Sequence, residues 1–238
     1  MKNFKVLGII PARSGSKGVP NKNIVKIHGK PLMNYSIEVA LKSNLITDLC
    51  LTSDNYEYLS IAEKAGCKNI ILRDSNLSND NAKSIDVVKD AILKISKKFK
   101  REYDAIILLQ PTAPLRTRND IDKSINILKN NPSIDSVISV VRTMSHHPYL
   151  IKKIEDGFLK SFIYEEKEGT RRQDYEPHAY LRNGSIYCTR INTVLKKSSL
   201  WGEKIMPLIM PEESSVNVDS YIDLKVLESL LKEKKCAE

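Results

Sequence analysis

The stretch Val6-Leu-Gly-Ile-Ile-Pro-Ala12 and the loop after it, Arg13-Ser-Gly-Ser-Lys-Gly-Val-Pro-Asn-Lys22, decide the fold. The first part is a short apolar run, and the second contains two glycines and three cationic side chains. Small residues let backbone N–H groups approach an anion, and fixed cations stabilise its charge. We therefore expect a buried strand over 6–10 and a phosphate-binding loop directly after it.

Downstream, short apolar segments alternate with amphipathic ones. This pattern predicts strands at 49–52, 69–72, 105–109 and 136–141, and helices at 33–42, 56–65, 84–95 and 121–129. Such alternation is typical of a mostly parallel α/β sheet. Asn119 or Asp120 is expected to cap the last of these helices, and the Asn-Asn-Pro run at 130–132 to end it.

The alternation fades between residues 145 and 180, where the sequence becomes polar, aromatic and mixed in charge. Strands at 185–189 and 205–210 and a helix over 221–232 then resume the earlier pattern. We interpret the middle segment as an excursion from the sheet that serves as a dimerisation arm. The predicted organisation is an α/β core over 1–144, an inserted arm over 145–182, and the remainder of the core over 183–238.

Composition excludes several classes of protein. Hydrophobic residues make up 41% and charged residues 28% of the chain, which is ordinary for a globular protein and excludes disorder and collagen. The longest apolar run is far shorter than the roughly 18 to 20 residues that span a bilayer, so no membrane span is expected. The four cysteines form no C-x-x-C pair, which argues against a zinc knuckle or redox motif. We expect reduced thiols and a cytoplasmic location.

The net charge of +9 indicates an anionic partner, and the cations are unevenly placed. Seven lysines and arginines precede the first acidic residue, Glu38. Nucleic acid, an acidic membrane face and small phosphorylated or carboxylated substrates are all candidates at this point. The sequence lacks both the G-x-x-x-x-G-K-[ST] and the G-x-G-x-x-G motif, so a Walker NTPase or a dinucleotide enzyme is not expected.

Several motifs along the chain point to one family. They are Ile9 to Ile24, Ser53-Asp54, Leu108-Leu-Gln-Pro-Thr-Ala-Pro-Leu-Arg116, Arg172-Gln173, Asn183-Gly-Ser-Ile-Tyr187 and Val218-Asp219. In order and spacing they resemble the acylneuraminate cytidylyltransferases of the nonulosonic acid type. The resemblance implies a three-layer α/β/α nucleotidyltransferase fold, Rossmann-like, with a small dimerisation arm. It also implies an enzyme that joins CTP to a nine-carbon keto sugar acid, releases pyrophosphate and requires Mg²⁺.

The resemblance further implies roles for individual residues. The residues expected to bind the nucleotide are Ala12, Arg13, Ser16, Lys17, Lys22, Asn23, Arg73, Ala82 and Ser84. Those expected to bind the sugar acid are Gln110, Arg172, Gln173, Asn183, Tyr187 and Trp201. Arg13, Lys22 and Asp219 would be catalytic, with Asp219 and Asn217 holding the metal. Arg172 would reach the partner's active site in a homodimer with shared sites.

Two positions depart from the family pattern. The acyl-binding aromatic pair of the family falls at Leu200 and Trp201, and the Asp-x-Asp metal motif reads Asn217-Val-Asp219. In an extended segment, residues two apart project to the same face, so Asn217 and Asp219 can reach one ion. An amide oxygen adds no negative charge, so we expect Asp219 as the essential ligand and Asn217 as an auxiliary one.

Purely structural roles of the same residues also remain as alternatives. Asp219 is equally suited to cap the last helix, residues 110–116 to form a stiff proline-rich turn, and Arg172 to lie among nearby glutamates as solvated charge. His146-His147 lacks a spaced carboxylate or thiolate, so we interpret it as a loop rather than a metal site. No side chain is an obvious general base.

Three other functions compete with the favoured one. Transfer to an eight-carbon octulosonic acid is the closest, and a non-catalytic nucleotide-binding regulator would share the same fold. A basic nucleic-acid-binding protein is the third, but aromatic residues are only 6% and lie away from the basic N-terminal region. We therefore expect CTP and a sugar keto acid as partners, and no nucleic acid.

Overall fold

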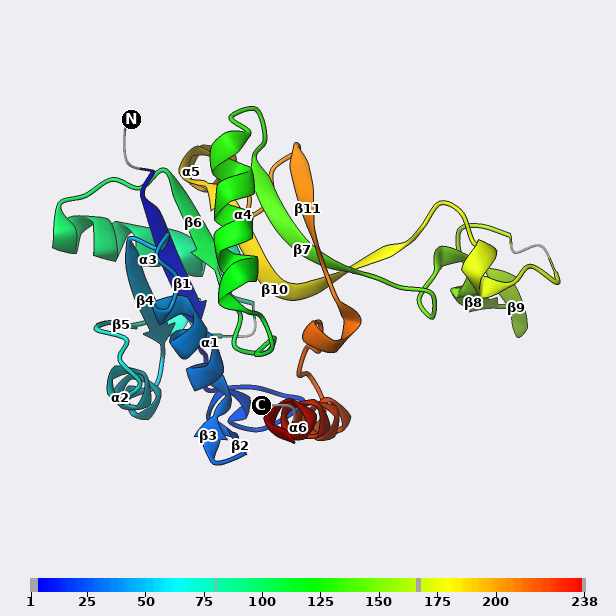
Figure 1. Cartoon of the computed structure of the whole chain (residues 1–238), viewed down its shortest axis with the longest axis horizontal. Coiled ribbons are helices and arrows are strands. Elements are labelled where there is room, and N and C mark those ends of the chain that lie inside the picture. Colours follow the sequence, from blue (N-terminus) through cyan, green and yellow to red (C-terminus); the bar gives the residue numbers. More distant parts are fainter. Residues whose placement is uncertain (1–3, 80, 166–167, 237–238) are drawn as a thin grey trace.

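A seven-stranded sheet in strand order β11-β7-β10-β6-β1-β4-β5 forms the centre of the computed structural model, which describes residues 4–79, 81–165 and 168–236 (Figure 1). Its strands are β1 Val6–Pro11, β4 Asp48–Ser53, β5 Asn69–Leu72, β6 Ala105–Leu108, β7 Ser136–Arg142, β10 Tyr180–Arg190 and β11 Ile205–Met210. Only β10 runs antiparallel to its neighbours, β6 and β7. The predicted mostly parallel sheet is confirmed.

Helices cover both faces of this sheet, so the fold has three layers (Figure 1). The six helices of the described residues are α1 Leu32–Leu41, α2 Tyr56–Lys64, α3 Ser84–Phe99, α4 Arg118–Asn130, α5 Ile191–Lys197 and α6 Tyr221–Cys236. Alternate residues of β1 face opposite layers: Val6 and Ile10 pack with α1, α2 and α4, whereas Leu7 and Ile9 pack with α3 and α5. The three-layer α/β/α fold expected from the sequence is confirmed.

The start of α4 corrects one sequence expectation. Thr117 is the N-cap: its side chain accepts a hydrogen bond from Asp120 N, and the Asp120 carboxylate accepts one from Thr117 N. This reciprocal pair satisfies two backbone donors at once, so Asp120 supports the cap from inside the helix and Asn119 takes no part. The helix therefore begins at Arg118, three residues before the predicted start at residue 121.

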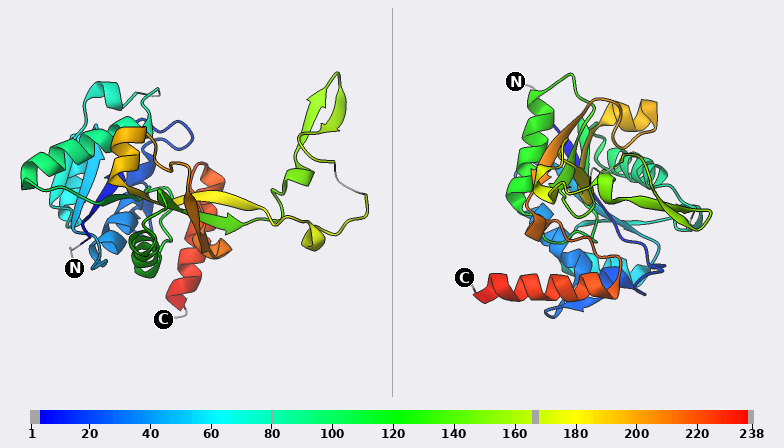
Figure 2. Two further views of the ribbon diagram at one scale, coloured as in Figure 1. Left: turned by 90° about the horizontal axis from the view of Figure 1, so that it is seen from above. Right: turned by 90° about the vertical axis from the view of Figure 1, so that its right-hand side faces the viewer.

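Strands β7 and β10 continue into an arm that projects from the sheet (Figures 1 and 2). The arm contains a two-stranded hairpin, β8 Lys152–Glu155 and β9 Phe158–Ser161, and the short 3₁₀ helix Arg172–Asp174. Within the arm, His147 packs against Tyr149 and Tyr175 with ring centroids 4.7 and 4.8 Å apart. The segment is a β-hairpin extension rather than another strand–helix unit, and its role and the three-part division of the chain stay predictions.

The C-terminal helix α6 packs on the loop after β1 rather than on the central sheet. Leu224 and Leu227 of α6 join Val19, Ile27 and Val218 in a third apolar cluster. Two two-residue strands, β2 Lys26–Ile27 and β3 Lys30–Pro31, fold this loop back toward α1. The C-terminal segment thereby lies next to the loop after β1. Within the part of the chain that the structure describes, none of the helices combines the length and apolarity needed to cross a bilayer.

Candidate active site

A cleft of about 650 Å³ opens beyond the carboxyl ends of β1, β5 and β6. Eleven of the residues predicted to form the site line it: Arg13, Ser16, Lys17, Lys22, Asn23, Arg73, Ala82, Ser84, Gln110, Asn217 and Asp219. Ligands of open α/β sheets bind at this edge, because the loops after parallel strands converge there. We call this hollow the first cleft.

The cationic loop after β1 is tied down at both ends. Asp54, just after β4, accepts hydrogen bonds from Ser14 N at 2.9 Å and Ser14 Oγ at 2.6 Å. Asn23 Nδ2 donates to the Arg13 carbonyl oxygen at 2.9 Å. Burial raises the pKa of Asp54, but the hydrogen bonds from Ser14 and the charge of Arg73 outweigh it and lower that pKa overall. Ala12 is buried in the core, where its N–H donates to Thr52 O, and it does not line the cleft.

Lys22, at the end of this loop, meets Asn217 and Asp219 in the lining of the first cleft. Lys22 Nζ lies 2.8 Å from Asp219 Oδ1, and Asn217 Nδ2 donates to Asp219 Oδ2 at 2.8 Å. The backbone passes so closely here that a Cβ on Gly18 would collide with the Asp219 carbonyl oxygen. Glycine is therefore required at position 18 for the loop and the C-terminal segment to come together.

The cap of α6 is Ser220 and not Asp219. Ser220 Oγ accepts from Asp223 N at 3.3 Å, and Asp223 Oδ2 accepts from Ser220 N at 2.7 Å. These reciprocal bonds form a capping box. The Asp219 side chain takes no part in it and points instead to Lys22 and Asn217, so its reading as a helix cap is wrong.

The donors around Asp219 fit a magnesium ion. Mg²⁺ is held through one or two carboxylates plus substrate phosphates and keeps several waters. Asp219 supplies one carboxylate, and Asn217 Oδ1 beside it is buried without a hydrogen-bond partner among the described residues. No group of three or more His, Cys, Asp and Glu side chains suited to a metal occurs in the described parts of the chain. A site completed by substrate oxygens is compatible with both observations.

Arg73, directly after β5, also lines the first cleft. Its guanidinium donates to Thr52 O at 2.9 Å and to Leu77 O at 3.4 Å, and the side chain is buried. Burial lowers the pKa of Arg73, partly offset by the carboxylate of Asp54. The N–H of Ala82 donates to Asn79 O at 3.1 Å within the neighbouring turn. Arg73 thus braces the segment that precedes α3.

A second cleft of about 420 Å³ adjoins the first. It is lined by Lys83, Ser84, Ile85, Leu108, Gln110, Arg182, Tyr187, Ser198, Ser199, Leu200 and Trp201. Ser84, Leu108 and Gln110 line both clefts, so a group bound in one can meet a group bound in the other. Of the predicted sugar-binding residues, Gln110, Tyr187 and Trp201 lie here.

Arg116 holds Gln110 at the junction. Its guanidinium donates to the Gln110 carbonyl oxygen, to Ser36 Oγ at 2.7 Å and to Ser185 Oγ at 3.2 Å. Burial lowers the pKa of Arg116 to about 9, although Asp120 opposes the shift. The turn at 110–116 is therefore stiff, as its prolines predict, and it also carries a site residue.

Besides Ala12, three of the predicted site residues line neither cleft. Asn183 is buried: its side chain accepts from Ser139 Oγ at 2.6 Å and donates to Ser215 Oγ at 2.9 Å. Arg172 and Gln173 lie in the arm and line neither cleft of this chain. Sequence reasoning missed Arg182, which lines the second cleft. The one signal in the sequence was that Arg182 directly precedes the Asn183 to Tyr187 motif. That position does not show where its side chain lies.

Comparison with known proteins identifies the family of this chain. The family model for cytidylyltransferases matches residues 7–234. The chain belongs to the cytidylyltransferase family. Membership makes the protein a nucleotidyltransferase, as its sequence predicted. The match extends from β1 through most of α6, and so includes both clefts.

Relatives of this cytidylyltransferase cover nearly its whole length. It is 35% identical to "post-translational flagellin modification protein B" of Campylobacter coli, over 97% of this chain and 96% of that protein. It is 32% identical to "CMP-N,N'-diacetyllegionaminic acid synthase" of Campylobacter jejuni, with 95% of each covered. It is also 32% identical to the N-acylneuraminate cytidylyltransferase of Escherichia coli, over 93% of this chain but only 51% of that protein.

A solved structure with a similar fold is that of CMP:2-keto-3-deoxy-manno-octonic acid synthetase complexed with CTP. It aligns with a TM-score of 0.72 over 97% of this chain and 99% of that one, at 18% identity. The structure of 4-diphosphocytidyl-2C-methyl-D-erythritol synthase from Anaerococcus prevotii aligns with a TM-score of 0.64 over 97% and 100%, at 14% identity. At these identities the likeness shows the shared fold alone.

Proposed function

We propose that this cytidylyltransferase joins CTP to a nonulosonic acid, giving the CMP-sugar and pyrophosphate. The observation that carries the proposal is the pair of clefts that meet at Ser84, Leu108 and Gln110. The first contains the cationic loop, and the second contains aromatic and hydroxyl side chains suited to a sugar. The relatives named for legionaminic, pseudaminic and N-acylneuraminic acids support this choice of acceptor.

The nucleotide would occupy the first cleft. Arg13, Lys17 and Lys22 line it and would neutralise the triphosphate, with the hydrogen-bonding side chains Ser16 and Asn23 nearby. The base would lie toward the other wall, formed by Arg73, Ala82 and Ser84. Charge grows on the leaving pyrophosphate during transfer, so cations already fixed by the loop contribute most in the transition state.

The reaction is an in-line substitution at the α-phosphorus. The anomeric hydroxyl oxygen of the sugar acid forms the new bond and its proton passes to solvent water, and the bond from the α-phosphorus to the bridging oxygen breaks as pyrophosphate leaves. The acceptor would lie in the second cleft, with Gln110 at the junction to align its hydroxyl with the phosphate. This chain's residues accelerate the transfer by positioning the reactants and stabilising charge. The reactants are then already in line before the bond forms.

Asp219 would hold Mg²⁺, with Asn217 as auxiliary donor. When bound, the ion supplies additional neutralisation of the phosphate oxygens. Lys22 adjoins the same carboxylate, at 2.8 Å from Asp219 Oδ1, so a protein cation and the metal would lie together beside the phosphates of CTP.

We further propose that the arm makes a homodimer with shared active sites. Large apolar side chains are exposed along the arm. Exposed apolar surface of this kind is typical of a protein–protein interface. The exposed side chains include Ile151, Ile154, Phe158, Leu159, Phe162, Ile163 and Tyr164. Arg172 lies in the same arm and outside this chain's clefts, so it would serve the site of a second copy. A bidentate guanidinium is well suited to the carboxylate of a sugar acid.

Cellular location is part of the same proposal. Cys50, Cys67 and Cys188 are free and buried thiols in the described chain. Free thiols are usual in a reducing compartment. We expect the enzyme in the cytoplasm, with CTP and a sugar keto acid as its ligands and no nucleic acid.

A pyrophosphate-release assay tests the proposed function. Each of the four NTPs is combined with N-acetylneuraminic, N,N'-diacetyllegionaminic, pseudaminic and octulosonic acids. We expect release with CTP and at least one nine-carbon acid, and much less with UTP, because a wrong base leaves buried polar groups unpaired. Turnover with octulosonic acid alone would move the protein to the eight-carbon class. CTP binding without turnover of any acid would make it a nucleotide-binding regulator.

A further inference from the structure

The arm contains one buried histidine that the proposed roles leave unused. His147 is only 3% exposed, although most of the arm around it faces solvent. Its Nδ1 accepts a hydrogen bond from Tyr149 N at 3.3 Å, so the ring proton is on Nε2. Nε2 lies 3.0 Å from the carbonyl oxygen of Pro177 and donates to it. Both ring nitrogens of this neutral histidine are therefore used within the arm.

The bond between His147 and Pro177 joins the two segments of the arm. His147 lies on the segment that leaves the sheet after β7, and Pro177 lies on the segment that returns to β10, 30 positions later. The backbone bond from Thr143 N to Ala179 O at 3.0 Å marks the root of the two segments. Beyond that bond, the His147 side chain ties the outgoing segment to the returning one.

Aromatic packing adds to this cross-link. The His147 ring centroid lies 4.7 Å from that of Tyr149 and 4.8 Å from that of Tyr175. Tyr149 also meets Tyr175 edge to face at 5.4 Å, and its hydroxyl donates to Glu176 O at 2.9 Å. Aromatic rings at these distances attract one another beyond the effect of burial alone. We call His147, Tyr149 and Tyr175 the arm cluster.

The arm cluster holds residues 175–177, which directly follow the turn that carries Arg172. Tyr175 belongs to the cluster, and the carbonyl oxygens of the next two residues accept the hydrogen bonds described above. The 3₁₀ helix Arg172–Asp174 ends at Tyr175, which is buried. Arg172 is thus three residues, at most about 11 Å of chain, from the cluster.

The placement of Arg172 depends on this anchor. The side chains of Arg172 and Gln173 are exposed, and the turn itself is closed by its backbone and by the flanking ion pair of Arg171 Nε and Asp174 Oδ2 at 2.7 Å. That ion pair fixes the shape of the turn, whereas the arm cluster fixes where the turn lies. An exposed turn without an anchor would have to be ordered when ligand binds, and this ordering lowers affinity.

Resting on the proposed function, we propose that His147 is a positioning residue for Arg172. By joining the two segments of the arm, it presents the Arg172 guanidinium in one place to the active site of a second copy. The acceptor then meets a cation that is already ordered, so the benefit is expected in acceptor binding. The first cleft is built from other elements, so CTP binding should not depend on His147.

Subunit complementation tests in which chain His147 acts. A His147→Ala chain is mixed with an inactive Lys22→Ala chain under conditions of proven subunit exchange, with saturating CTP. The acceptor is the nine-carbon acid that gives the fastest pyrophosphate release, at a concentration well below KM. There, His147→Ala alone should retain about a tenth of wild-type activity, the usual effect of losing a buried hydrogen bond.

One site of each mixed dimer combines the intact cleft of the His147→Ala chain with the intact arm of the Lys22→Ala chain. We expect about a quarter of wild-type activity at equal mixing, against about a twentieth if His147 served only its own chain. Activity near a twentieth, while Lys22→Ala and Arg172→Ala do complement, would overturn this inference and leave the proposed function intact. Failure of both mixtures would overturn the shared-site dimer itself.

Two conservative variants identify the contact that matters. The amide nitrogen of glutamine can replace Nε2, so His147→Gln can still donate to Pro177 O. The amide oxygen of asparagine can replace Nδ1, so His147→Asn keeps only the local bond from Tyr149 N. We expect KM for the acid to rise about tenfold in His147→Asn and less in His147→Gln, with KM for CTP within about twofold of wild type in both. A larger rise in His147→Gln would contradict the cross-link.

His146→Ala is the matched control. His146 is exposed, and its ring bonds locally to the Thr143 and Ser145 side chains, so its loss should change neither KM. Light scattering measures the mass of each variant in solution, and all are expected to be dimers. A monomeric His147→Ala chain would show that His147 builds the interface instead of positioning Arg172, and would also overturn this inference.

Discussion

Lys22 Nζ lies 2.8 Å from Asp219 Oδ1, although 197 positions separate the two residues in the chain. The Lys22 side chain is 12% exposed and that of Asp219 67% exposed, so the lysine is packed and the carboxylate faces the cleft. The contact exists because α6 packs on the loop after β1 and leaves no room for a side chain at Gly18. The loop after β1 and the C-terminal segment therefore build one end of the first cleft together.

Substitution of Asp219 tests this arrangement. Asp219→Ala should abolish turnover at any practical Mg²⁺ concentration, because Asp219 supplies the one carboxylate among the described residues that line the first cleft. Thermal unfolding should change little, since the cap of α6 is Ser220 with Asp223. Turnover close to wild type in Asp219→Ala would show that the residue has no part in the reaction.

Asn217→Asp tests the auxiliary donor. The new carboxylate adds negative charge beside Asp219, so the Mg²⁺ concentration for half-maximal rate should fall severalfold while the enzyme stays active. Direct binding of Mn²⁺, followed by electron paramagnetic resonance, should tighten in the same direction. Weaker Mn²⁺ binding in Asn217→Asp would contradict a metal at this position.

Asp54 should act on CTP binding through the cationic loop. It accepts from both Ser14 N and Ser14 Oγ, and its pKa is lowered by these bonds and by Arg73 against the effect of burial. Asp54→Ala frees the loop, so KM for CTP should rise about tenfold with a much smaller change in KM for the acceptor. Steady-state kinetics measure this, and Glu57→Ala on the exposed start of α2 is a control.

Subunit complementation tests the arm. An inactive Lys22→Ala chain and an inactive Arg172→Ala chain are mixed under conditions of proven subunit exchange. If Arg172 serves the partner's site, one of the two sites in each mixed dimer contains both residues, so about a quarter of wild-type activity should return at equal mixing. No recovery would place Arg172 in the site of its own chain or outside the reaction.

Ionisation of the Cys67 thiol should contribute to a loss of stability at alkaline pH. Burial raises its pKa from the usual value of 9.0 to about 11, partly offset by a backbone hydrogen bond at Asn69. Below pH 9 the thiol is neutral in both states and contributes nothing. Between pH 9 and 11 the unfolded chain loses the proton while the folded chain keeps it, so stability falls as pH rises.

Chemical denaturation measures that loss. Because Cys67 ionises in the unfolded chain first, the free energy of unfolding should fall by about 1 kcal/mol between pH 8 and pH 10. Cys67→Ala lowers stability at every pH by leaving a small cavity, but its curve should be flatter over this interval. Parallel curves for the two proteins would contradict the raised pKa.

The sheet was predictable from sequence because its strands are short apolar runs, which in the central strands β1, β4 and β6 are buried on both faces. Strands β5 and β11 have the predicted bounds, Asn69–Leu72 and Ile205–Met210. The start of α4 was missed because Thr117 was not recognised as part of a capping box with Asp120. Periodicity marks where a helix is buried, whereas its first turn is exposed and is decided by capping.

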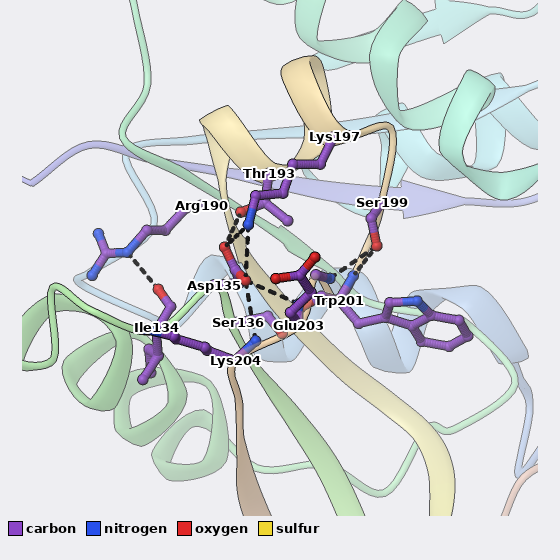
Figure 3. Close-up of polar contacts among 11 residues, drawn as sticks. Ile134, Asp135, Ser136, Arg190, Thr193, Lys197, Ser199, Trp201, Glu203 and Lys204 are labelled. Carbon is purple, nitrogen blue, oxygen red and sulfur yellow. Dashed lines mark hydrogen bonds and ion pairs between the residues drawn. The ribbon is translucent and has the colours of Figure 1, made fainter.

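The first cleft was also largely predictable, since its residues belong to recognisable motifs at strand ends. The stack of the Arg182 guanidinium on the Trp201 ring and the contacts of Asp135 were not. Asp135 contacts Lys197, Glu203 and Lys204 across more than 60 positions (Figure 3), and nothing local in these residues signals the pairing. Contacts of this kind depend on how β7, β10 and β11 lie side by side, which the sequence pattern does not specify.

The most direct test of the central claim is mass spectrometry of the products formed from CTP, Mg²⁺ and a nonulosonic acid. We predict that N,N'-diacetyllegionaminic or N-acetylneuraminic acid is converted to its CMP-sugar, with one pyrophosphate per product molecule. Formation of a CDP-sugar with inorganic phosphate, or of free CMP with no sugar conjugate, would contradict transfer of CMP to these acids.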